Sequence, residues 1–170
     1  MKSNHFFAQL SKHLLLVSIA LNFTSANIPL SPEPEIFAGS TPCNPVMRPL
    51  LAIPADMDCE FVKWNLLLFK NPENHSLNSF KLNVTFGIAK GGTQGFTDAS
   101  KSSEFKGKWS VRKNTGKLPG ESVIGLESTG QKQIISFLKL DENLLHLLDS
   151  EEKLMIGNAA WSYTLNRTRK

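Results

Sequence analysis

Hydrophobic and polar residues alternate along much of the chain after Cys59, and a period of two predicts β-strands. The clearest case is segment 80–88, in which five apolar residues alternate with four polar or small ones. Segment 62–69 begins in the same way and ends in a run that is apolar on both faces. The same reasoning predicts further strands at 105–112, 122–127, 133–140, 144–149, 154–156 and 160–166. The short apolar run 144–148 fits a helix equally well.

Clusters of glycine, proline, asparagine and aspartate separate these segments and predict turns. They lie at 71–74, 91–95, 114–120, 128–130, 141–143 and 157–158. Six to eight short strands without helical crossovers predict antiparallel pairing, and an open meander would leave two unpaired edges. We therefore expect an all-β protein, a small antiparallel up-and-down β-barrel of the lipocalin-like kind.

The N-terminal segment has the layout of a secretory signal peptide. Its start is basic, with Lys2 and Lys12. An apolar run follows at 14–21, and small residues end the segment at Ala26. The run is shorter than the roughly 20 residues of a membrane-spanning helix, so no membrane span is expected. The predicted organisation is a signal peptide at 1–26, an extended proline-rich leader at 27–36 and a single β-barrel domain at 37–170. The expected location is the periplasm or the exterior, as a soluble protein.

The charge balance argues against a nucleic-acid partner. The chain has 19 basic and 15 acidic residues, for a formal net charge of +4. Removal of a signal peptide containing Lys2 and Lys12 would leave 17 basic residues against 15 acidic ones. So small an excess does not supply the concentrated basic face that contacts to phosphates require.

The two cysteines, Cys43 and Cys59, predict one disulfide bond, because an exported chain meets an oxidising compartment. The segment between them, 44–58, contains three prolines and reads as an irregular loop with room for one helical turn. A disulfide at this spacing would hold the loop closed.

Several short segments, taken in order, resemble a known family. They are FAGSTPC at 37–43, Cys59, LLLF at 66–69, FKGKW at 105–109, the segment 141–149 and YTL at 163–165. Together they are similar to the N-terminal domains of bacterial envelope lipoproteins of the NlpE type. The resemblance implies a small lipocalin-related barrel and a role in envelope or copper homeostasis and surface-stress signalling. The chain departs from that family in three ways: 15 residues separate its cysteines instead of two, and both the lipobox cysteine and the second domain are missing.

The chain contains none of the common catalytic or nucleotide-binding motifs, so we do not expect an enzyme. The expected function is that of an exported, non-enzymatic binding or interaction module, whose partner is a small apolar ligand or an envelope protein. The candidate ligand-binding residues are aromatic side chains predicted to line the barrel interior: Trp64, Trp109, Trp161 and Tyr163. The same side chains would equally fill a solid core.

An alternative function is copper binding by soft donor atoms. Cys43, Met47, Met57 and Cys59 lie within one loop, and thiolate and thioether ligands together select Cu(I). A disulfide would remove both thiolates and leave the methionines to fill apolar gaps. No other cofactor is expected.

Overall fold

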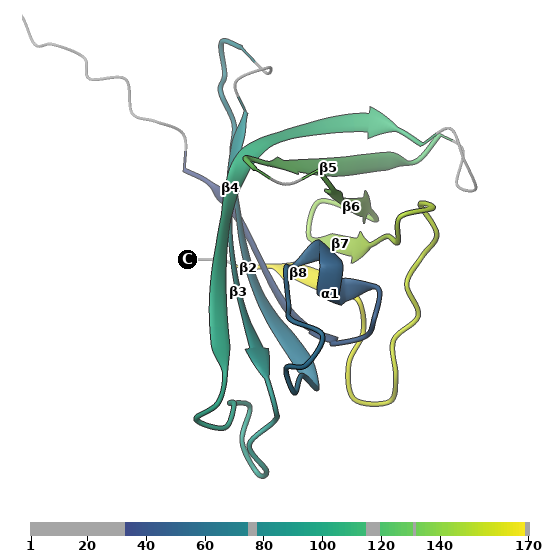
Figure 1. Cartoon of the computed structure of the whole chain (residues 1–170). Coiled ribbons are helices and arrows are strands. Elements are labelled where there is room, and N and C mark those ends of the chain that lie inside the picture. The colour runs from purple at the N-terminus through teal and green to yellow at the C-terminus, as the bar shows by residue number, and fades with distance from the viewer. Residues whose placement is uncertain (1–32, 75–77, 115–119, 131, 169–170) are drawn as a thin grey trace, which may run out of the picture. The chain divides into compact units, whose positions relative to one another are not determined.

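The chain folds into a closed antiparallel barrel of eight strands that follow one another in chain order (Figure 1). The computed structural model describes residues 33–74, 78–114, 120–130 and 132–168. The strands are β1 (Glu35–Pro42), β2 (Phe61–Phe69), β3 (Ser79–Gly87), β4 (Lys101–Lys113), β5 (Ser122–Ser128), β6 (Ile134–Lys139), β7 (Leu144–Leu147) and β8 (Thr164–Arg167). The predicted all-β, up-and-down barrel is confirmed. The predicted signal peptide at 1–26 lies outside the described residues.

The alternation in β2 and β3 builds the barrel wall as the sequence predicts. Trp64, Leu66 and Leu68 are buried, whereas their neighbours along β2 are more exposed. The register places Trp64 opposite Val84 and Leu68 opposite Phe80, so the buried positions of both strands face the same side. These inward side chains belong to one contiguous apolar cluster that also receives residues from β4 to β8.

The sequence did not predict strand β1. It predicted an extended leader up to residue 36 and no strand before residue 62. The structure instead begins β1 at Glu35, paired with β2 along its full length. Two of the inward positions of β1 are occupied by Gly39 and Thr41. Because neither is a large apolar residue, β1 lacks the alternation of apolar and polar residues that identifies the other strands. Both have a structural reason to be there: a Cβ on Gly39 would lie 2.4 Å from the Thr164 carbonyl oxygen, and the Thr41 hydroxyl accepts the indole N–H of Trp64.

Two predicted strands near the C-terminus differ from the structure, and one open alternative is decided. Segment 154–156 is not a strand, because it contributes only an isolated bridge between Leu148 and Leu154, and Ile156 is 84% exposed. The run 144–148 adopts the strand alternative as β7, whose backbone pairs with both β6 and β8. The last predicted strand, 160–166, shortens and shifts to Thr164–Arg167.

The segment between the cysteines packs into the barrel core at the end where β1 stops and β2 starts, and we call residues 44–58 the plug. It contains the single helical turn α1 (Met47–Leu50). Met47 and Leu51 are fully buried within the same apolar cluster as the strand residues. The predicted disulfide between Cys43 and Cys59 is confirmed, with Cα atoms 5.7 Å apart. Within the described ranges, no helix has the length and hydrophobicity needed to cross a membrane.

Candidate functional site

Three of the four predicted ligand-binding residues are packed inside the barrel. Trp64, Trp109 and Tyr163 are 2%, 6% and 1% exposed. The Trp64 indole N–H donates to Thr41 Oγ1 at 2.9 Å, and the Trp109 indole N–H donates to the Phe69 carbonyl at 3.0 Å. Since rings and polar atoms are both engaged within the protein, these side chains fill the core.

The fourth residue, Trp161, lies outside the barrel wall, so the prediction that it lines the interior is wrong. It stacks on Phe61, with ring centroids 5.1 Å apart and planes inclined by 5°. Phe61 points outward from β2, because the alternation directs Val62 and Trp64 inward. The other face of Phe61 is covered by Phe96, with centroids 4.2 Å apart. We call these three rings the aromatic stack.

Phe61 is only 3% exposed although it faces away from the core. Two loops bring the outer rings onto it: the β3–β4 connection supplies Phe96, and the chain before β8 supplies Trp161. Hydrogen bonds hold both loops in place. Asn158 accepts the Trp161 backbone N–H on its side-chain oxygen at 2.8 Å. In the β3–β4 connection, Glu60 accepts the Ala89 N–H at 2.9 Å.

A cavity of about 360 Å³ opens beside the aromatic stack, and we call it the outer cavity. Strand residues Ser40, Phe61 and Lys63 line it together with Trp161. The remaining lining residues, Ala89, Thr93 and Gln94, come from the β3–β4 connection. The cavity occurs close to where β1 leaves β8, since Ala38 is the last β1 residue paired with β8.

Of the described residues that line the outer cavity, Lys63 alone is charged. Its ammonium lies 5.6 Å from the centroid of the Phe96 ring, within the range of a cation–π contact. Its cross-strand neighbours are Ser40 on β1 and Thr85 on β3, which carry hydroxyl groups and no charge. The cavity therefore combines ring surfaces, one cation and uncharged polar groups.

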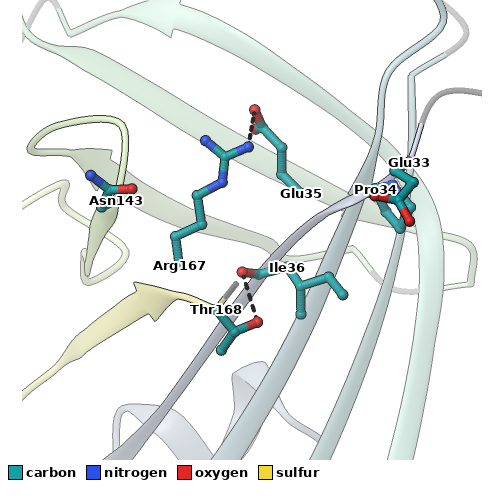
Figure 2. A pocket seen from close by; sticks show the side chains of 7 residues that line it. All are labelled: Glu33, Pro34, Glu35, Ile36, Asn143, Arg167 and Thr168. Carbon is teal, nitrogen blue, oxygen red and sulfur yellow. Dashed lines mark hydrogen bonds and ion pairs between the residues drawn. The ribbon is translucent and has the colours of Figure 1, made fainter. Parts of the chain in front are cut away.

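A second cavity, of about 280 Å³, lies over the seam where β8 closes the barrel against β1 (Figure 2). Two of its charged residues, Glu35 and Arg167, form an ion pair with each other. Glu35 accepts from Lys70 at 2.9 Å and from Arg167 at 3.3 Å. The Thr168 backbone N–H and hydroxyl both donate to the Ile36 carbonyl, at 2.8 and 3.4 Å. The contacts of Arg167 and Thr168 hold β8 against β1. The polar groups of this cavity therefore serve to close the barrel.

The structure does not assemble the soft-donor set predicted for copper. Cys43 and Cys59 are bonded to each other, so neither supplies a thiolate. Met47 is fully buried in the core, and Met57 packs against it. Among the described residues, no group of three or more histidine, cysteine, aspartate or glutamate side chains is arranged to hold a metal ion.

The chain matches no known family, no curated protein and no solved structure. The resemblance to NlpE-type domains stays a prediction.

Sequence reasoning missed Phe61, Phe96 and Lys63 as members of a site. One signal was present: Phe61 sits on the polar phase of the β2 alternation, next to Lys63 and Asn65. A large aromatic residue at an outward position needs a cover from outside the barrel. The residues that supply the cover are distant in sequence, so only the fold could identify them.

Proposed function

We propose that this chain is an exported, non-enzymatic binding module that takes a small ligand in the outer cavity. The observation that carries the proposal is the aromatic stack with its adjoining cavity. Phe61 is held rigidly between two rings, and ligand sites on proteins commonly combine such ring surfaces with a few polar groups. A pre-formed wall of this kind lowers the conformational cost of binding.

The barrel interior is filled with side chains, so we place the ligand site on the outside of the barrel. Trp64, Trp109 and Tyr163 fill the core, and the plug adds Met47 and Leu51 to the same cluster. An interior ligand would have to displace these buried side chains, at a cost of several kcal/mol. The outer cavity requires no such rearrangement.

Export and an envelope location are part of the proposal. The disulfide between Cys43 and Cys59 supports them, because such bonds persist in oxidising compartments. The resemblance of the sequence to NlpE-type domains adds an envelope role. A copper function would need the thiolates that the disulfide removes.

Tryptophan side-chain NMR tests the proposed site directly, because the chain has three tryptophans in distinct places. Trp64 and Trp109 report on the core and Trp161 on the outer cavity. In a screen of water-soluble aromatic and sugar fragments, we expect hits to shift the Trp161 indole N–H signal. The same hits should bind Trp161→Leu more weakly, as measured by calorimetry.

Two results would overturn the proposal. The first is a set of hits that shift Trp64 and Trp109 while leaving Trp161 unchanged, since this would place the ligand in the core. The second is the absence of any hit at millimolar fragment concentrations. Thermal unfolding of Trp161→Leu serves as the control for a folded variant.

A further inference from the structure

We infer that the outer cavity selects small planar carboxylates, with the carboxylate at Lys63 and the ring beside Trp161 and Phe61. This inference rests on the proposed binding function and names its ligand class. It follows from two independent features of the cavity. The Lys63 ammonium has no ion-pair partner among the described residues, and the Phe61 ring offers only its edge to a ligand.

Lys63 has no ion-pair partner among the described residues, unlike several other strand lysines. Lys81 and Lys106 share the Glu104 carboxylate, and Lys139 pairs with Glu142. Within the described part of the chain, none of the ion pairs involves Lys63, and its contact with the Phe96 ring supplies only a partial negative charge.

The acidic residue closest in sequence to Lys63 is already engaged. Glu60 uses Oε2 to accept the Ala89 N–H at 2.9 Å, and this bond anchors the β3–β4 connection. Among the residues that the structure describes, the cavity lining contains no aspartate or glutamate. An anionic ligand would therefore meet a cation without a competing carboxylate among the lining residues.

The geometry of the aromatic stack favours the same ligand charge. Both faces of Phe61 are covered, one by Phe96 and the other by Trp161, so only its ring edge can contact a ligand. The edge of an aromatic ring carries partial positive charge, whereas its face carries partial negative charge. An edge next to an ammonium group attracts a carboxylate and disfavours a cation.

The shape and polar lining of the cavity set the size of the ligand. Its volume of about 360 Å³ is near the lower end for small-molecule sites. Half-buried Trp161 offers apolar surface for a planar ring, and the Ser40 hydroxyl lies next to Lys63 in the β1–β2 register. The Thr93 hydroxyl is already bonded to Lys90 and Gly95, so its role is to hold the loop.

Three matched probes separate the contributions of ring and charge: indole-3-acetate, its neutral amide indole-3-acetamide, and acetate. Their affinities for the full oxidised protein are measured from the Trp161 indole N–H shift, with isothermal calorimetry as a second readout. We expect indole-3-acetate to bind about two- to fivefold more tightly than the amide, the usual scale of one partly exposed charge pair. Acetate should bind more weakly than either.

The variants Lys63→Gln and Trp161→Leu test the two halves of the site. Lys63→Gln should remove the preference for acid over amide, because it weakens binding of the acid most. Trp161→Leu should weaken both indole compounds and is read by calorimetry, because the reporter ring is gone. Lys108→Gln is the matched control: Lys108 is an exposed lysine on β4 and does not line the cavity, so this change should leave the preference intact.

Each alternative outcome has a distinct meaning. Equal binding of acid and amide in the unmodified protein would overturn the carboxylate inference while the binding function stands. Acetate binding as tightly as indole-3-acetate would overturn the role of the ring. If no probe moves the Trp161 signal and none of the fragments in the wider screen does so, the binding function itself fails.

Discussion

The side chain of Asn44 is hydrogen-bonded to the hydroxyl of Tyr163, which ties the plug to the chain that enters β8. The Asn44 side-chain oxygen also accepts the Met47 backbone N–H at 3.0 Å, at the start of α1. Tyr163 in turn accepts the Leu147 N–H on its backbone carbonyl at 2.8 Å. One asparagine thus links the start of the helical turn, the plug and the closing strand of the barrel.

Tyr163 should titrate at unusually high pH. Burial raises the pKa of its phenol above 10.0, and the hydrogen bond from Asn44 only partly opposes the rise. Because the unfolded chain loses this proton first, Tyr163 contributes stability below pH 10 that is lost as the pH rises through its native pKa. It is the only tyrosine in the chain, so phenolate absorbance reports it alone.

The measurement compares absorbance titrations of the native protein and of protein in denaturant. The native midpoint should be the higher one, and Tyr163→Phe should reduce the alkaline loss of stability. Identical midpoints in the two states would contradict the prediction.

Glu104 should contribute to the acid sensitivity of the fold. Hydrogen bonds from Lys106 and then Lys81, at 2.6 and 2.7 Å, lower the pKa of its carboxyl to about 2. A lowered native pKa gives stability that is present above the unfolded value near 4.5 and is lost as the pH falls toward 2. Chemical denaturation between pH 6 and pH 2 should therefore show a shallower decline in Glu104→Gln.

The Glu104 side chain is exposed, so the effect should be small and should fade in salt. Glu127→Gln, an exposed carboxylate on β5, is the comparison variant. A pH dependence that is the same in both variants would count against the role of Glu104.

The disulfide should contribute strongly to stability. Its 16-residue separation corresponds to about 3 kcal/mol in the loop-entropy estimate. Replacing both Cys43 and Cys59 by serine should lower the free energy of unfolding by about that amount in a denaturant titration. Reduction of the unmodified protein should reproduce the loss, and reduction of the double variant should change nothing further.

Gly39 should not tolerate a side chain. A Cβ at this position would lie 2.4 Å from the Thr164 carbonyl oxygen and 2.8 Å from Leu165 Cδ2, so β8 would have to move. We expect Gly39→Ala to cost about 1–3 kcal/mol. Gly91→Ala is the control, because nothing lies within 4 Å of its Cβ, and its effect should stay within about 0.5 kcal/mol.

Trp109 and Trp161 should differ sharply in their effect on stability. Trp109 is buried in the core, and Trp109→Ala should cost about 3–5 kcal/mol by equilibrium denaturation. Trp161 lies outside that cluster, so Trp161→Ala should cost clearly less. Equal losses would place Trp161 in the same cooperative core as Trp109.

The alternation in β2 and β3 was sufficient to predict strands, inward faces and antiparallel pairing. Side-chain direction in a strand is a local property, and a buried face must be apolar along its length. The same rule failed for β1, whose inward Gly39 and Thr41 are explained by contacts with β8 and Trp64. It also failed for 154–156, where an apolar stretch lacks a partner strand.

Sequence alone determined the strand-rich barrel, its turns and the pairing of two cysteines, because these depend on local periodicity and on a count of two. Only the tertiary structure decided which side of the wall each aromatic residue occupies. Trp161 and Tyr163 are two positions apart, yet one stacks on the outer face of Phe61 and the other is buried in the core. That difference arises because Trp161 belongs to the irregular connection before β8, whereas Tyr163 directly precedes β8 and its side chain enters the core. The outer cavity is likewise built from β1, β2 and two distant loops, and their meeting is a property of the closed barrel.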